Sequence, residues 1–290
     1  MATSISITRL RNTVAPRLPA ATVEWDHRFM EQYSNVLRLY FNQLDSLLAA
    51  LLSGTGGAYL QFPYGAFHQD GTTTLSSGIT NVSTTPINVG STTDFPTTGW
   101  ILIGSEIIAY TGKTSTTFTG ITRGVLGTTN VAHSAGDAVS EVQGTGSPTT
   151  IGQVLFTNTD YSNGVYTTSA DLSKIYFSNA GIYNLQFSAQ LLNFTTNEDN
   201  VTIWLRKNGT DVPVSAGVEQ VNSKHGTSPG ARIAAWNYLL DVQAGDYVQL
   251  VWTTDTGNTV VASYPAGTSP VHPVSPAMIF TATFVSAVAA

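Results

Sequence analysis

The fold is decided by the stretch Tyr183-Asn184-Leu185-Gln186-Phe187-Ser188-Ala189-Gln190-Leu191, in which apolar and polar residues alternate without a break. Successive side chains of a β-strand point to opposite faces of the sheet. A period of two therefore places the apolar residues on one face and the amides and hydroxyls on the other. This pattern predicts a strand with one face buried in a core.

The same alternation returns further along the chain. It occurs at Val201, Ile203 and Leu205, at Val248, Leu250 and Trp252, and at Met278, Phe280, Ala282 and Phe284. Asn208-Gly209 follows the first of these segments and is typical of a two-residue type I′ hairpin. Weaker strands are expected around Val154, Val165, Val214, Ile233 and Val260. Eight to ten strands, as estimated from these patterns, are enough for an antiparallel β-sandwich over residues 147–290.

A smaller β module is expected before the sandwich, over residues 58–146. It is rich in Thr and Gly, and its apolar strand segments are Ile101 to Ile103 and Ile107 to Tyr110. Gly104-Ser105, Thr111-Gly112 and Arg123-Gly124 are turn signals between them. Within this range the segment from Phe62 to Gly65 is interpreted as linker, and the β structure is expected from about Gly71 to Val142.

A long amphipathic helix is predicted between Thr22 and Leu52, within an N-terminal attachment and oligomerisation region of residues 1–57. Thr22 is a candidate cap, Glu24 and Asp26 suit the first turn, and Gly54 follows the other end. The apolar residues advance by three and four in turn, which is heptad spacing. They are Met30, Tyr33, Leu37, Tyr40, Leu44, Leu47 and Leu51.

This apolar stripe needs a cover, because exposed apolar surface costs roughly 25 cal/mol per Å². Three covers are open: the chain's own domain, a parallel bundle with sister chains, or a groove on another protein. Trp25, Phe29, Val36, Phe41 and Leu48 widen the stripe. That width favours a bundle of more than two helices or a further partner.

Composition limits the classes of function. Only 10% of the 290 residues are charged, the net charge is -6, and there is no cysteine. Nucleic-acid binding needs a basic surface, which this chain lacks, and a disulfide framework is excluded. No segment has the roughly 20 apolar residues of a membrane span, and the N-terminus lacks the apolar core of a signal peptide. Assembly in a cytoplasm, without membrane insertion, is therefore expected.

Three segments of the last half of the chain resemble the C1q/TNF-like jelly rolls. Phe177 to Phe187 is similar to the family's F-x-x-x-G-x-Y-x-F strand, Trp204 to Gly209 to its strand before an N-G hairpin, and Leu239 to Leu250 to its L-x-L-x-x-G-D-x-V-x-L segment. Two departures are that Leu185 replaces an aromatic residue and that the segment from Phe280 to Phe284 lacks a glycine. The resemblance implies a jelly-roll head that forms a compact homotrimer.

Two other segments resemble pieces of phage structural proteins. Residues 22–44 look like an N-terminal segment of cyanophage virion proteins. Ile103 to Gly112, Thr117 to Gly124 and His133 to Gly136 are similar to a β module that recurs in phage tail and fibre proteins. This resemblance, rather than composition, implies a place in a virion.

Catalytic and cofactor motifs were weighed and none is assigned. Gly226-Thr227-Ser228-Pro229-Gly230 matches the G-x-S-x-G elbow in letters, but Pro229 has no N–H to donate to an oxyanion. Gly112-Lys113-Thr114 copies the end of a phosphate loop without its first glycine. The oxygen-rich residues Asn197, Glu198, Asp199 and Asn200 are a weak calcium candidate, with a hydrated turn as the alternative.

These observations predict a mainly β, trimeric structural component of a bacteriophage virion, a fibre or tail-associated appendage, that acts by assembly and catalyses no reaction. Its expected partners are its own copies, other virion proteins, and a host-surface glycan or protein; Trp236 and Tyr264 are candidate sugar-stacking residues. A capsid decoration protein docked through the helix is one alternative. A glycan-degrading tailspike is another, although no pair of carboxylates marks one.

Overall fold

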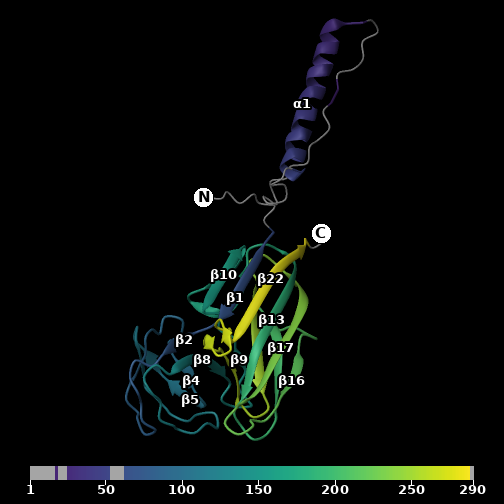
Figure 1. Cartoon of the computed structure of the whole chain (residues 1–290). Helices are drawn as coiled ribbons and strands as arrows, with labels where there is room; N and C mark the ends of the chain where they lie inside the picture. The colour runs from purple at the N-terminus through teal and green to yellow at the C-terminus, as the bar shows by residue number, and fades with distance from the viewer. Residues whose placement is uncertain (1–16, 19–24, 53–61, 288–290) are drawn as a thin grey trace. The chain divides into compact units, whose positions relative to one another are not determined.

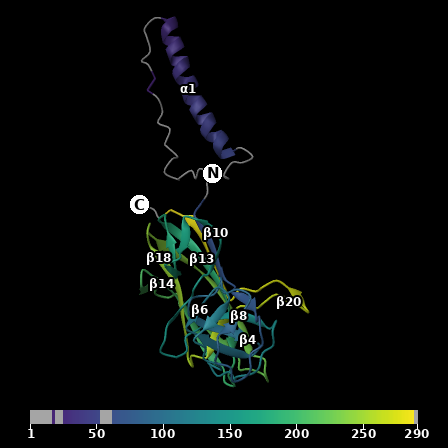
Figure 2. The ribbon, with the colours of Figure 1, turned by 90° about the vertical axis from the view of Figure 1, so that its left-hand side faces the viewer.

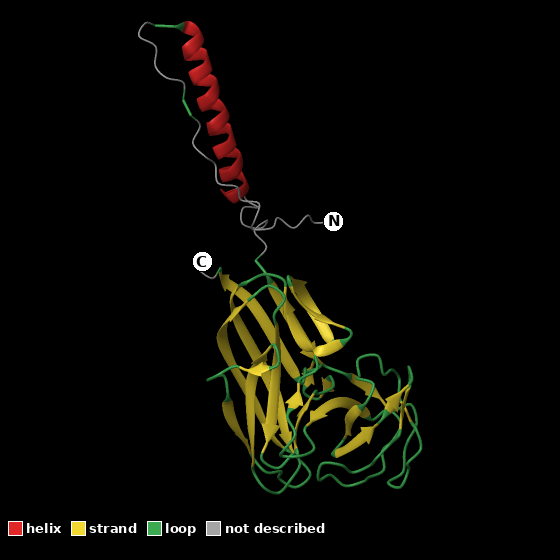
Figure 3. Cartoon of the chain, turned by 180° about the vertical axis from the view of Figure 1, so that it is seen from behind, coloured by secondary structure: helices red, strands yellow, loops and turns green. Residues whose placement is uncertain are grey.

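The computed structural model describes residues 17–18, 25–52 and 62–287, with the backbone alone for residues 47–52. The chain divides into two compact units, Met1–Phe62 and Pro63–Ala290, which are described separately. In the described residues the first unit contains one helix, and the second contains strands joined by loops (Figure 1, Figure 3). The prediction of a mainly β chain with antiparallel sheets is confirmed.

The helix α1 (His27–Leu52) begins later than the sequence suggests. Asp26 caps it: its Oδ1 accepts a hydrogen bond of 2.9 Å from the Arg28 N–H, and its carbonyl accepts one of 3.2 Å from the Met30 N–H. Trp25 and Asp26 are not helical. The expected start at Thr22 is therefore wrong, because the carboxylate of Asp26 caps the free Arg28 N–H four residues later. Thr22, Glu24 and Gly54 lie outside the described residues.

Two sheets of the second unit enclose the larger core (Figure 1). The first is formed by β10 (Asn158–Asn163), β1 (Tyr64–Gln69), β22 (Met278–Ser286), β13 (Gly181–Asn193) and β17 (Gly230–Val242), in this order. The second follows the order β11 (Val165–Thr168), β12 (Asp171–Phe177), β18 (Tyr247–Thr254) and β14 (Asp199–Lys207). β14 also pairs with β15 (Thr210–Asp211) and β16 (Gly217–Val221), and β18 pairs with β9 (Gly152–Gln153).

The predicted inward faces are confirmed for the clearest strands. Tyr183, Leu185, Phe187, Ala189 and Leu191 are all buried, and none exposes more than 5% of its surface. The inward residues of β14 and β18 and the first three of β22 are buried as well. Alternation thus predicted correctly which side chains form this core.

The hairpin after β14 is also as predicted. Asn208 and Gly209 have φ angles of 50° and 81°, and Lys207 pairs with Thr210 across the two-residue loop. A type I′ turn requires positive φ at both central positions, which Asn and Gly adopt at low cost.

Two strand assignments are wrong. Val214 lies in no strand, is 99% exposed and has a φ of 63°, because the chain turns at Pro213 before β16. Residues 64–69, interpreted as linker or small module, form β1, whose Phe67 is fully buried in the sandwich core. Gly65 and Gln69, which share the inward side with Phe67, weakened the apolar alternation of β1 in the sequence.

The smaller module occupies the chain between β1 and β9 and has its own core, formed by residues such as Ile101, Ile108 and Phe118. The hairpin β4–β5 is joined by Gly104-Ser105, as the turn signals predicted. The module's strands are β2 (Thr72–Thr74), β3 (Ile87–Asn88), β4 (Gly99–Ile103), β5 (Glu106–Tyr110), β6 (Gly112–Lys113), β7 (Thr117–Thr119) and β8 (Ala138–Gly144).

One strand ladder joins the module to the sandwich. β8 pairs with β19 (Thr259–Ala262), and β19 pairs with the last residues of β13. The expected division between residues 146 and 147 stays a prediction, since the two cores are distinct but share this ladder. The unit Pro63–Ala290 is called the β unit below. A short hairpin of β20 (Gly267–Thr268) and β21 (Val271–His272) stands out from it in Figure 2.

Candidate functional site

The outer face of the β22-β13-β17 sheet is the best candidate for a functional surface. The residues that alternate with the buried ones point away from the core on this face. The register places them in cross-strand rows, namely Thr283–Asn184–Leu239, Thr281–Gln186–Asn237 and Ile279–Ser188–Ala235, followed by Gln190–Ile233.

None of the side chains in these rows is charged. Ile233 and Leu239 expose 65% and 67% of their surface, and Asn237 Nδ2 donates a 3.3 Å hydrogen bond to Asn184 Oδ1 on the neighbouring strand. Charged residues are depleted at the centre of protein interfaces, where they would lose their hydration. This face is called the uncharged face below, and it has the composition of a surface that another protein covers.

The outer face of the second sheet has a different character. Tyr166, Tyr176 and Tyr247 pair across β11, β12 and β18, and their ring centroids are 5.6 Å apart at each step. Lys174 lies 4.7 Å from the Tyr247 ring and forms an ion pair with Asp171. The four rows of the first face carry no charge, and Asp241 of β17 lies only in the next row, opposite Ile182, so the two faces are suited to different surroundings.

The helix supplies a second candidate surface. Met30, Tyr33, Leu37, Tyr40 and Leu44 are half-buried or exposed, and no side chain of residues 27–46 is buried. Leu39 and Phe41 expose 61% and 56% of their surface. The side chains of Leu47 and Leu51 lie outside the described residues. The predicted interface stays a prediction, and its described members retain surface that a partner helix would cover.

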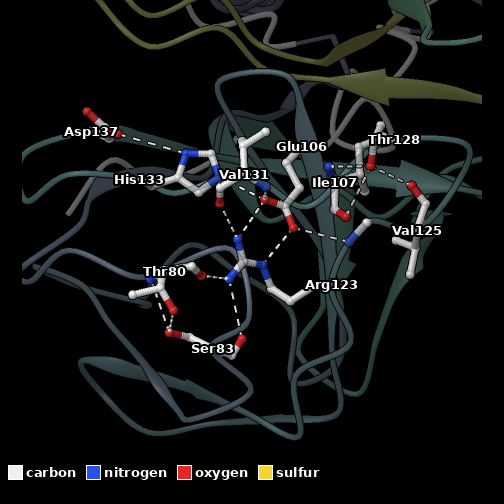
Figure 4. A network of polar contacts seen from close by, with 11 residues as sticks. Thr80, Ser83, Glu106, Ile107, Arg123, Val125, Thr128, Val131, His133 and Asp137 are labelled. Carbon is white, nitrogen blue, oxygen red and sulfur yellow. Dashed lines mark hydrogen bonds and ion pairs between the residues drawn. The ribbon is translucent and has the colours of Figure 1, made fainter.

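The recurring module motifs meet in one buried polar network, shown in Figure 4. Arg123 donates to both carboxylate oxygens of Glu106, at 2.6 and 2.7 Å, and both side chains are at least 97% buried. The same guanidinium donates to the carbonyls of Thr80, Ser83 and Val131. Glu106 and Arg123 therefore tie three loops of the module together.

Glu106 has further donors around it. His133 Nε2 lies 2.9 Å from Oε2, and the Val131 and Gly124 N–H groups donate to the carboxylate. Burial alone would raise the pKa of Glu106, but the hydrogen bonds from Arg123, Val131 and His133 outweigh it and lower the pKa below its usual value. With its hydrogen bonds satisfied, this network is suited to stabilising the module. The motifs contained its residues, but spacing alone did not reveal that they meet.

The two segments whose sequences match catalytic or phosphate-binding motifs, residues 226–230 and 112–114, lack the geometry that those motifs require. Gly226 to Gly230 forms a turn between β16 and β17, closed by hydrogen bonds between His225 and Ser228, and a strand follows where the elbow requires a helix. Lys113 ends the short strand β6 and donates to the carbonyls of Thr92 and Phe95. The interpretation of Lys113 as a strand-to-turn lysine is confirmed.

The calcium candidate lies at the start of β14. The Asp199 carboxylate accepts hydrogen bonds from the N–H and hydroxyl groups of both Thr256 and Thr259. The Asn197 carbonyl accepts from Asn193 and Thr195, and the Asn200 amide donates to Asp255. Among the described residues no group of three or more acidic or histidine side chains is placed to hold a metal. Calcium binding stays a prediction, and the geometry uses Asp199 to fasten a loop.

The two aromatic residues considered for sugar stacking are packed against the protein. Trp236 contacts Phe187 edge to face, with ring centroids 4.8 Å apart. Tyr264 packs on the apolar cluster where the module meets the sandwich. Other aromatic residues of the β unit are more exposed: Tyr161 exposes 67% of its surface and Tyr166 exposes 40%.

Comparisons with known proteins add no assignment: no model of a protein family matches the chain, and no curated protein is significantly similar to it. Within the described residues, no helix combines the length and the apolar character needed to cross a membrane.

Proposed function

We propose that this chain is a trimeric structural subunit of a bacteriophage virion, a fibre or tail-associated appendage that acts by protein assembly. The uncharged face is the observation that carries the proposal. A sheet surface of small, amide and aliphatic side chains, with Ile233 and Leu239 mostly exposed, is stabilised when neighbouring copies of the chain cover it.

The strand order supports a jelly-roll head. Eight strands, numbered along the chain as β1, β12, β13, β14, β16, β17, β18 and β22, enclose the larger core. Their order is 1-8-3-6 in one sheet and 2-7-4-5 in the other. Strands that alternate between two four-stranded sheets in this way are typical of the double Greek key of a jelly roll.

Self-association is favoured over a foreign partner on both candidate surfaces. Glutamine, asparagine and threonine side chains both donate and accept hydrogen bonds, so this face can bind the polar backbone and side-chain groups of neighbouring copies around a three-fold axis. The helix stripe has heptad spacing, which suits packing against parallel copies. Two self-complementary surfaces on one chain give a cooperative assembly.

The place in a virion rests on the resemblance of residues 22–44 and of the module motifs to phage structural proteins. In this proposal α1 attaches or assembles the subunit, the module acts as a spacer, and the jelly roll is the head. Host-surface recognition belongs to the charged, tyrosine-bearing face of the second sheet, which self-association through the uncharged face leaves free.

Two variants test the assembly through the uncharged face. Ile233→Lys introduces a charge there, and Val218→Lys introduces the same charge on β16 of the other sheet, where Val218 is also 65% exposed. Sedimentation over a range of protein concentrations should show that Ile233→Lys dissociates at concentrations where wild type and Val218→Lys remain assembled. A dissociation curve for Ile233→Lys that matches wild type would refute assembly through this face.

The virion location has a direct test. An antibody against the β unit should label particles purified on a density gradient from a culture infected with the phage that encodes the chain. Electron microscopy would show where on the particle the label lies. Recovery of the protein only in the particle-free fraction would contradict the proposal.

A further inference from the structure

Glu141 occupies the joint between the module and the sandwich. It lies on β8, opposite Ile101 of β4, one residue before Val142 pairs with Ala262 of β19. Its N–H donates to the Gly71 carbonyl at 2.7 Å, and its carbonyl accepts from the Ser263 N–H. The backbone of Glu141 therefore connects strands of both parts.

The side chain of Glu141 is fully buried, and neither carboxyl oxygen has a donor within hydrogen-bond geometry. The nearby amides of Gln69 and Gln143 favour the ionised form, but the burial of the carboxyl group outweighs them. A Cβ built on Gly71 would lie 2.7 Å from Glu141 Oε2, so the backbone packs directly against the carboxyl group. A buried charge without a partner is strongly unfavourable, so the neutral acid is the form that this site accepts.

The ionisable groups around Glu141 do not replace a partner. The charge of Asp70 disfavours a negative charge on Glu141, and Tyr110 donates its hydroxyl to the Pro96 carbonyl. Lys113 attracts a negative charge on Glu141, but its ammonium group already donates to loop carbonyls, with a distance of 2.6 Å to that of Thr92. An ionised Glu141 would thus gain little inside the joint.

We propose that Glu141 makes this joint sensitive to pH: its proton holds β8 packed against the sandwich, and loss of that proton loosens the module. The inference is independent of the proposed virion function. It assigns a role to a buried acid that neither assembly surface uses.

The direction of the effect follows from the two states of the joint. Burial raises the pKa of Glu141 to about 8, and the charge of Asp70 adds to this effect. When the joint opens, water reaches the carboxyl and its pKa returns toward the ordinary 4.5. Between these values opening releases a proton, so the opening equilibrium constant rises by up to about tenfold per pH unit. The joint is therefore tighter in mild acid and looser in mild alkali.

Hydrogen exchange at the β8–β19 ladder measures this opening. Exchange rates at about pH 5.5 and pH 7.5, corrected for base catalysis of exchange itself, should show opening that increases by up to about a hundredfold in wild type. Glu141→Gln removes the ionisable group and should abolish that increase. Glu198→Gln, at an exposed position, should retain it, and amides between β14 and β18 should show none of it.

The outcomes separate cleanly. Equal pH dependence in wild type and Glu141→Gln would overturn the proposal. The pH dependence would then come from groups that both proteins contain, such as the histidines, and not from Glu141. A second measurement covers the case in which the variant does not fold. The carboxyl carbon of Glu141 in the wild-type chain, followed by NMR, should report a neutral acid at about pH 6.5; an ionised Glu141 at that pH would also overturn it.

Discussion

Arg123 and Glu106 show at the scale of single residues how a Thr-rich module with a small core is stabilised. The pair is bidentate and almost fully buried, and it connects segments that are 17 residues apart in the chain. Removing one partner of such a pair leaves an uncompensated buried charge. The loss is therefore much larger than the gain that a surface pair brings.

Arg123→Met should destabilise the β unit by about 3–5 kcal/mol, because it leaves the Glu106 carboxylate without its main partner. Arg206→Met removes an ion pair whose Asp211 partner is 56% exposed, and it should cost at most about 1 kcal/mol. Urea unfolding of both variants and wild type measures the difference. Equal losses for the two substitutions would show that the network does not hold the module.

Glu106 also predicts a response to acid opposite in sign to that of Glu141. Its folded pKa lies below the ordinary 4.5, so its contribution is complete above that value and is lost as the pH falls through the folded pKa. The free energy of unfolding of wild type should therefore fall below about pH 4.5 more steeply than that of Glu106→Gln. Parallel curves would contradict the assigned hydrogen bonds.

At the scale of elements, the strength of a pattern decided which strands could be predicted. β13 and β14 alternate cleanly and were assigned correctly. β1 was missed because its inward residues include Gly65 and Gln69 in place of apolar side chains. Val214 was assigned a strand because its apolar side chain suggested burial. Nothing in a local window reveals that β1 belongs beside β22, which is more than 200 residues away.

The helix makes its own prediction. Leu37→Asp combined with Leu44→Asp places charges in the apolar stripe and should weaken the assembly, whereas Gln32→Asp with Gln43→Asp alters exposed positions and should not. Both double variants add two negative charges to the same helix. Sedimentation at matched concentrations distinguishes them, and identical behaviour of the two would exclude the stripe as an interface.

At the scale of the whole molecule, the uncharged face could not be predicted as a site. The sequence showed these polar residues as alternate residues of each strand. Only the order β22-β13-β17 shows that they form four adjacent rows without charge. The joint at Glu141 depends in the same way on segments as distant as Gly71 and Ser263. Such sites form where the strand order brings distant segments together. Sequence patterns therefore predicted the individual strands, but not which residues meet.

The central claim is that this chain needs copies of itself, and the mass of the full-length protein in solution tests it most directly. Sedimentation equilibrium at micromolar concentration should report three copies of the 30.8 kDa chain. A single species with the mass of one chain, stable and soluble at that concentration, would contradict the account.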